Sequence, residues 1–406
     1  MKNLPQFCIY RICIVTIAIA TLFLAASLHG QQSPQPGVSP TEIRIGNITC
    51  YTGWAKEYAA VVRAEGAYFA MINDRGGLHG RKIKFISEDN ACESGKSVAL
   101  AKKLVEQDDV LLLFSVLGTE SNLAIRNYMN EKQVPQLFLE SSSSIFNDPA
   151  HFPWTMGFFA TYRTEGSAYA KYILQNKPNA KIAILSADDD AGHEYVAGLR
   201  EGLGAKVSMI VKEATYSPND ENLDKQITSL KESAADVFAN FSIGPFATQS
   251  VAKAFDQDWH PLQFIPNASV TISSFLQPAG LNKANGVLSN ARSKGWHADQ
   301  ALHDPAIREF LDWMKKYNPD ANLRDQNNVA GYERAQTLIE VLQKCGDDLS
   351  RTNVMKQAAN LNFESNMLRP GIRIKTSPTD YQPIKDLFLI QFDGKQWQPI
   401  GPVTSE

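Results

Sequence analysis

The sequence predicts an α/β protein with two lobes, each built on a doubly wound parallel sheet. Short apolar runs alternate with helical patterns over residues 42–139, and the same alternation starts again after residue 158. The run VLLLF at residues 110–114 is apolar without a break, as in strands that are buried on both faces of a parallel sheet. The length of 406 residues suits two or three lobes.

The first 30 residues differ from the rest of the chain. Lys2 and Arg11 precede an uncharged apolar run at residues 12–28, after which come small residues and the polar stretch QQSPQPG. This pattern predicts a secretory signal peptide, residues 1–30, that is cleaved on export to the periplasm. A retained membrane anchor is the alternative.

In the first lobe, predicted strands and helices follow one another in strict alternation. Gly76 and Gly77 end the first helix. Strands are expected at residues 42–48, 82–87, 110–114 and 134–139, and helices at residues 56–73, 98–107 and 119–131.

The second run of alternation is followed by elements of a different kind. Helices are expected at residues 164–175, 194–203, 223–232 and 245–255, and strands at residues 181–185, 206–212, 236–240, 263–265 and 286–288. Two long helices near residues 305–317 and 326–344 and a pair of strands near residues 372–375 and 387–392 complete the chain.

The loops after the strands at 110–114 and 134–139 form the first candidate site. Thr119 is a plausible N-cap of the next helix, whose first N–H groups lack partners and carry the positive end of the helix dipole. Four serines at residues 141–144 follow the second strand. Both loops leave the carboxyl edge of the sheet, where open sheets bind ligands, so hydroxyls and amides could meet there around a carboxylate. The alternative is a helix cap and a solvated serine loop.

Composition and cysteine content limit the partners and the redox chemistry. A net charge of -3 gives no reason to expect nucleic acid or an anionic membrane as partner. After loss of the signal peptide, Cys50, Cys92 and Cys345 remain, which is one pair and one spare. We predict a Cys50–Cys92 disulfide, because these residues follow neighbouring strands at the same sheet edge. Two buried free thiols are the alternative.

Several motifs, taken in order, resemble the solute-binding proteins of ABC importers in the leucine/isoleucine/valine-binding group, which have a type I periplasmic binding fold. The motifs are AYFAMINDRGGLHGRKI at residues 67–83, EDNACES at 88–94, LGT at 117–119, EGSAYAKYIL at 165–174 and GYERAQTLIEVL at 331–342. The resemblance covers nearly the whole mature chain. It implies two lobes joined by three crossovers, with a solute bound between them and a hinge that closes over it.

The resemblance also implies where the lobes lie and what the protein works with. Lobe 1 would be residues 41–161 and 291–386, and lobe 2 residues 162–290 and 387–406. The partners would be a small carboxylate or amino-acid ligand and the membrane permease and ATPase of an importer, with no cofactor and no metal.

Site residues follow from matching positions in the family. Thr119 and Ser142, with backbone near Gly118 and Glu140, would hold the ligand carboxylate, and Tyr58 would line the pocket.

Two positions depart from relatives that bind amino acids. Tyr162 stands where an acid usually pairs with the ligand ammonium, and Ala191 stands where a tyrosine is usual. Phe158, Phe159 and Phe241 are expected near the same edge. We therefore favour an aromatic or apolar acid as ligand. A branched-chain or other amino acid is the alternative, with the acidic residues 188–190 as ammonium partners or as a solvated cap.

Rival functions find little support in the motifs. There is no G-x-S-x-G elbow and no phosphate-binding loop, so we do not expect an enzyme. A ligand-sensing receptor module remains an alternative, because the same fold serves receptors.

Overall fold

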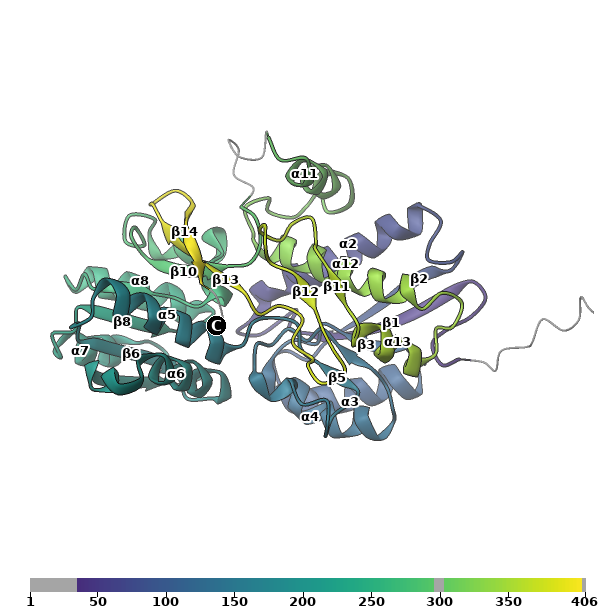
Figure 1. Cartoon of the computed structure of the whole chain (residues 1–406), viewed down its shortest axis with the longest axis horizontal. Helices are drawn as coiled ribbons and strands as arrows, with labels where there is room; N and C mark the ends of the chain where they lie inside the picture. The colour runs from purple at the N-terminus through teal and green to yellow at the C-terminus, as the bar shows by residue number, and fades with distance from the viewer. Residues whose placement is uncertain (1–34, 296–302, 404–406) are drawn as a thin grey trace, which may run out of the picture. The chain divides into compact units, whose positions relative to one another are not determined.

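The structure is a computed structural model that describes residues 35–295 and 303–403. The predicted signal peptide, residues 1–30, lies outside these ranges. Strands of the described chain form two large sheets, which Figure 1 shows as two separate groups of arrows.

The first large sheet has five parallel strands in the order β2-β1-β3-β4-β5. On β3, Phe114 packs against Phe69 of α2, with ring centroids 5.8 Å apart. Its neighbour Leu113 belongs to a separate apolar cluster with Leu104 of α3 and Ile125 of α4. Because successive strand residues point to opposite faces, helices cover both sides of this sheet, as predicted. Figure 1 shows α2 and α12 on one side and α3 and α4 on the other.

The elements of this part are as follows. The strands are β1 (Glu42–Thr49), β2 (Lys82–Asp89), β3 (Leu112–Phe114), β4 (Gln136–Leu137) and β5 (Thr155–Met156). The helices before residue 150 are η1 (Lys56–Tyr58), α2 (Ala59–Asp74), α3 (Ser94–Glu106), α4 (Thr119–Glu131) and η2 (Ser144–Phe146).

The second large sheet has seven strands in the order β14-β13-β10-β9-β8-β6-β7. Its strands are β6 (Ile182–Ala187), β7 (Ile210–Tyr216), β8 (Val237–Phe241), β9 (Leu262–Phe264), β10 (Leu288–Ala291), β13 (Leu387–Phe392) and β14 (Trp397–Val403). Strands β6 to β10 are parallel, whereas β13 runs antiparallel to both of its neighbours, β10 and β14, and a hairpin joins it to β14. The two-lobe α/β fold is therefore confirmed, and the second sheet is mixed.

Helices also cover both faces of the second sheet. Leu199 of α6 shares one apolar cluster with Phe241 of β8, whereas Leu230 of α7 shares another with Phe238 of the same strand. The helices are α5 (Tyr162–Asn176), α6 (Asp190–Leu203), η3 (Gly204–Met209), α7 (Asp224–Lys231), α8 (Pro245–Asp256), η4 (Asn267–Ser269), η5 (Ile272–Leu276) and α9 (Gln277–Ala279).

One sequence prediction of a strand needs correction, and two others hold. The strand expected at residues 206–212 begins at Ile210, because η3 continues directly from α6 at Gly204. Both late strands expected near residues 372–375 and 387–392 are present, and they join different sheets. β12 (Ile374–Lys375) pairs with β11 (Asn362–Phe363) in a small sheet, and β13 pairs with β10 and β14.

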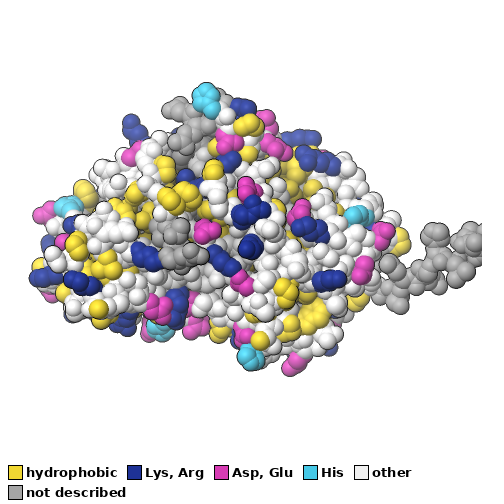
Figure 2. Space-filling view, in the orientation of Figure 1, with side chains coloured by type: hydrophobic (Ala, Val, Ile, Leu, Met, Phe, Trp, Pro, Cys, Tyr) yellow, Lys and Arg dark blue, Asp and Glu magenta, His cyan; other side chains and the backbone are white. Residues whose placement is uncertain are grey.

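The late helices share the apolar core of the five-stranded sheet. Phe310 of α11 (Pro305–Tyr317) and Leu338 of α12 (Asn327–Lys344) lie in the same cluster as Phe69 and Phe114. Val354 of α13 (Arg351–Ala358) joins them. On the face shown in Figure 2, basic and acidic side chains are intermingled, in keeping with the small net charge of -3.

Candidate functional site

A cavity of about 610 Å³ lies at the carboxyl ends of strands from both large sheets. Its walls include residues that follow β1, β3 and β4 of the first sheet and β6, β8, β9 and β10 of the second. All six residues predicted to bind a ligand, and both cysteines predicted to pair, line it: Tyr58, Gly118, Thr119, Glu140, Ser142, Tyr162, Cys50 and Cys92. The carboxyl edge of open sheets is the usual place for a ligand, so this cavity is the candidate site.

Hydroxyl groups gather at one part of the cavity wall. Thr119 Oγ1 and Ser141 Oγ are hydrogen-bonded at 2.8 Å. The Tyr162 side chain interacts with both of these hydroxyls and with the backbone of Ser142. Burial raises the pKa of Tyr162 to about 12, although these hydrogen bonds lower it. The phenol therefore keeps its proton at neutral pH and can donate it to an acceptor such as a carboxylate oxygen.

The beginning of α4 differs from the sequence prediction. Gly118, with φ of 92°, is the N-cap, and Thr119 is the first helical residue. A positive φ favours glycine, which explains its place here. The Gly118 N–H donates to the Glu140 carbonyl at 3.1 Å, and the Glu140 N–H donates to Val116 at 3.0 Å. Both N–H groups are therefore used in hydrogen bonds between the two loops. The N–H groups that remain for a ligand are those of the first turn of α4, which lack partners within the helix.

The Glu140 side chain belongs to a buried charge cluster that the sequence analysis missed. It forms an ion pair with the fully buried Arg334 of α12, which also donates to Ser115 Oγ at 2.5 Å and Glu65 Oε1 at 3.2 Å. Burial raises the pKa of Glu65 to about 8, while the neighbouring Arg334 lowers it. An arginine in the middle of the apolar pattern GYERAQTLIEVL was the signal for this cluster.

Aromatic side chains form much of the remaining wall. The Tyr58 hydroxyl donates to the carbonyl of Ala268 at 3.1 Å, and burial raises the pKa of this tyrosine. Phe159, Tyr162 and Tyr195 also line the cavity, and the Tyr162 and Tyr195 rings lie 4.8 Å apart. Phe158 and Phe241, which we expected near the same edge, are buried core residues at 1% exposure.

The four serines after β4 fall into two groups. Ser141 and Ser142 line the cavity. Ser143 Oγ donates to Glu194 Oε1 at 2.6 Å, and the N–H and Oγ of Ser144 donate to the same carboxylate at 2.9 and 3.1 Å. Glu194 lies on α6, beside the seven-stranded sheet, so its carboxylate connects elements of the two sheets. We call this contact the Glu194 clasp.

The acidic residues 188–190 all line the cavity, at the start of α6. Asp189 is the N-cap of the helix and accepts a hydrogen bond from Gly192 N at 2.8 Å. Asp188 Oδ1 lies 3.4 Å from His193 Nε2. This segment therefore caps a helix and still presents carboxylates to the cavity.

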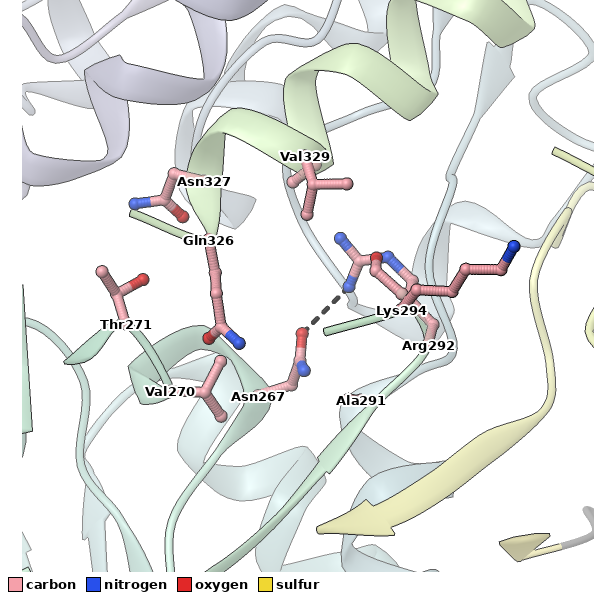
Figure 3. A pocket seen from close by; sticks show the side chains of 11 residues that line it. Asn267, Val270, Thr271, Ala291, Arg292, Lys294, Gln326, Asn327 and Val329 are labelled. Atoms are coloured by element: carbon pink, nitrogen blue, oxygen red, sulfur yellow. Dashed lines mark hydrogen bonds between the residues drawn. The ribbon is translucent and has the colours of Figure 1, made fainter. Parts of the chain in front are cut away.

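Arg292, which follows β10, is one of the wall residues that the sequence analysis missed. Its guanidinium lies 4.0 Å from the centre of the Phe159 ring. It also donates to Asn267 Oδ1 at 2.9 Å, the hydrogen bond drawn as a dashed line in Figure 3. Burial lowers the pKa of Arg292, while the nearby Glu333 carboxylate raises it. No sequence motif marks this residue, because its neighbours Asn267 and Phe159 are far away in the chain.

The predicted cysteine pair lies at the edge of the cavity. The Cα atoms of Cys50 and Cys92 are 5.0 Å apart, within the range that a disulfide needs, and the structure joins the two residues. Cys345 is a buried free thiol at the end of α12. Asp89 holds the two loops together, since it accepts hydrogen bonds from Tyr51 N at 2.9 Å and Thr52 Oγ1 at 2.7 Å.

The described residues hold neither a cluster of metal-binding side chains nor a membrane-spanning helix. Within residues 35–295 and 303–403, no group of three or more His, Cys, Asp or Glu side chains is placed to hold a metal ion. None of the helices in these ranges combines the length and the apolar character needed to cross a membrane.

Comparisons with known proteins agree with this geometry. Residues 42–396 match the family model described as periplasmic binding protein. An amino acid binding protein of Pseudomonas aeruginosa is 24% identical over 196 residues, which are 46% of this chain and half of that protein. A branched chain amino acid ABC transporter structure from Thermus thermophilus with bound valine has a TM-score of 0.80, 16% identity and coverage of 91% of this chain and 97% of that one. A solute binding protein from R. palustris in complex with 4-hydroxybenzoate has a TM-score of 0.76, 18% identity and coverage of 89% and 97%.

Proposed function

The chain belongs to the periplasmic binding protein family, and we propose that it is the extracytoplasmic solute-binding component of an ABC importer. The ligand that we infer is a small carboxylate with an aromatic or apolar body. The observation that carries this proposal is the cavity of about 610 Å³, whose wall has hydroxyl groups in one part and aromatic rings in another. The hydroxyls suit a carboxylate, and the rings suit an apolar body.

The carboxylate would bind to hydroxyls that come mainly from loops of the five-stranded sheet. Thr119 and Ser142 line the cavity, and the Tyr162 phenol interacts with Thr119. The first turn of α4 adds N–H groups and the positive end of its dipole. A carboxylate at this place would gain several charge-assisted hydrogen bonds.

Among the described wall residues, three polar groups are neutral or already engaged, which supports a ligand without an amine. Tyr162 is a neutral phenol, Glu140 is paired with Arg334, and Glu165 accepts hydrogen bonds from Tyr169 and from Asn267 N. An amino acid remains the second candidate, because the carboxylates of residues 188–190 line the same cavity and could pair with an ammonium group.

We also propose that the lobes are residues 41–161 with 291–386 and residues 162–290 with 387–406. Strands β13 and β14 lie in the seven-stranded sheet, and α11 and α12 share the core of the five-stranded sheet, which supports this division. Export to the periplasm after removal of residues 1–30, and docking to a membrane permease and ATPase, complete the proposal.

Calorimetric titration of the mature protein tests the function. We expect benzoate to bind more tightly than leucine. Thr119→Ala should weaken benzoate binding by roughly 1–3 kcal/mol, because a buried charged acceptor loses a donor. Thr379→Ala, an exposed threonine outside the cavity, is the matched control and should bind as the wild type does. Tighter binding of leucine would reverse the order of ligands, and native affinity in Thr119→Ala would place the carboxylate elsewhere.

A further inference from the structure

Arg292 is a buried cation in the wall of the candidate site. It directly follows β10 of the seven-stranded sheet, and its side chain is 12% exposed. Phe159 and Asn267 hold the guanidinium from two sides, with the ring centre at 4.0 Å and Asn267 Oδ1 at 2.9 Å from Nη1. Asn267 is itself fixed, because its Nδ2 donates to the Asn290 carbonyl at 2.7 Å. The guanidinium is therefore held in one position.

The guanidinium has more hydrogen-bond donors than the surrounding residues use. An arginine side chain carries five N–H donors. Within the described residues, Nε has no hydrogen-bond partner, and the nearest Glu333 carboxylate oxygen is 3.8 Å away. Nε itself is buried and lies towards Glu333, so the Nη groups are the donors that can meet the cavity. Within the described residues these groups make one hydrogen bond, to Asn267, so an oxygen atom that enters the cavity would gain a donor here.

Arg292 lines two cavities. It lines the large cavity of about 610 Å³ and also a smaller one of about 50 Å³, shown in Figure 3. Four lining residues are common to the two cavities: Asn267, Arg292, Asn327 and Ala330. Arg292 thus lies where the two cavities share a wall.

Arg292 and the hydroxyl groups come from different sheets. Thr119, Ser141 and Ser142 belong to loops of the five-stranded sheet, whereas Arg292 follows a strand of the seven-stranded sheet. A ligand that spans the cavity can therefore bind the hydroxyls with its carboxylate and present another part of its body to Arg292.

Electrostatics favour a neutral oxygen at this second place over another carboxylate. The Glu333 carboxyl group lies 3.8 Å from Arg292 Nε, and Glu140 and Glu165 also act on Arg292, as does the cation Arg334. A second ligand carboxylate would meet these acidic groups, whereas a hydroxyl or carbonyl oxygen accepts a hydrogen bond without adding charge.

We propose that Arg292 is a specificity-determining residue that donates a hydrogen bond to a neutral oxygen of the ligand, remote from its carboxylate. The preferred ligands are then hydroxylated or carbonyl-bearing aromatic or aliphatic acids. This inference rests on the proposed function, since it assumes that the hydroxyl groups hold the carboxylate.

Pairs of acids that differ by one hydroxyl group provide the test. We would titrate the mature protein with benzoate and 4-hydroxybenzoate, and with hexanoate and 6-hydroxyhexanoate. Because a hydrogen bond to a charged donor is at stake, the wild type should prefer the hydroxylated member of at least one pair by about 10- to 100-fold. This measurement needs no variant, so it does not depend on whether a substitution at a buried site folds.

Variants then assign the preference to Arg292. Arg292→Met should lower the affinity for the hydroxylated acid by about the same factor and leave the affinity for its partner within about threefold, which abolishes the preference. Arg292→Lys keeps the charge but loses the planar set of donors, so we expect it to reduce the preference only in part. Lys294→Met removes a neighbouring cation that lines only the smaller of these two cavities, and it should keep the preference.

The outcomes separate this inference from the proposed function. Equal affinity for both members of each pair in the wild type overturns the role of Arg292 alone. An equal loss for both members in Arg292→Met also overturns it, because Arg292 would then hold the carboxylate. Binding of leucine with no binding of any of the four acids overturns both the inference and the proposed ligand class.

Discussion

The Glu194 clasp allows a direct test of how the two lobes close over a ligand. The Glu194 carboxylate on α6 accepts hydrogen bonds from Ser143 Oγ at 2.6 Å, Ser144 N at 2.9 Å and Ser144 Oγ at 3.1 Å. Glu194→Ala removes all three contacts, and neither Glu194 nor the two serines line the cavity. We expect the variant to favour the open arrangement of the lobes.

The size of the effect follows from the number and exposure of these bonds. A hydrogen bond to a charged group contributes roughly 1.5–3 kcal/mol when it is buried. The clasp is only partly buried, so water can replace the carboxylate in the variant, and a total of about 1–3 kcal/mol is the reasonable range. A change of 1.4 kcal/mol is about tenfold in an equilibrium constant, which gives a shift of about 5- to 150-fold toward the open form.

Ligand affinity should change by the same factor if the closed form is rare without ligand, and by less if it is common. Calorimetry with benzoate and small-angle scattering of the ligand-free protein measure the two quantities. Glu201→Ala is the matched control. Glu201 is an exposed glutamate on the same helix, and it pairs with Arg163 instead of the serines. A Ser144→Ala, Glu194→Ala double-mutant cycle should show a coupling of about 0.5–2 kcal/mol. Unchanged affinity and an unchanged radius of gyration in Glu194→Ala would refute the reasoning.

Two further predictions concern stability. We expect a Cys50–Cys92 disulfide. Its removal in the double serine variant should lower the unfolding free energy by up to about 4 kcal/mol, in the chain-entropy model for a separation of 42 residues. Non-reducing peptide mapping checks the bond, and alkylation of both residues in unreduced, unfolded protein would contradict it. Burial raises the pKa of Glu165 from 4.5 to about 7. Between these pH values the folded protein keeps a proton that the unfolded chain loses. The unfolding free energy should therefore fall as the pH rises from 4.5 to 7. Glu165→Gln should remove this contribution, of roughly 3 kcal/mol at most, and denaturant titrations of both proteins at pH 5 and pH 7 compare them. Equal pH dependence of the two proteins would show that this carboxyl titrates normally.

The sequence by itself determined the class of fold and the place of the candidate site. Apolar runs such as residues 110–114, alternating with helical periodicity, are local signals of a sheet covered on both faces, and the structure has such sheets. The carboxyl-edge rule brought Thr119 together with the serines at 141–144, and the resemblance to the family singled out Ser142 and added Tyr58. Thr119, Ser142 and Tyr58 all line one cavity.

Only the tertiary structure decided how the polar groups of the site are used. Nothing near Glu194 in the sequence predicts its contacts, and only the folded chain brings it to Ser143 and Ser144. In the same way, Arg334 is one charge in an apolar helical pattern, and only the folded chain pairs it with Glu65 and Glu140. Partners of this kind lie tens to hundreds of residues apart, and no local period encodes them. The pairing of β13 is also decided by the tertiary structure, because β13 adds antiparallel to β10, at the edge of the parallel part of the sheet. Hydrophobic patterning is a property of each segment and can be found in the sequence, whereas the pairing of buried charges is a property of the assembled chain.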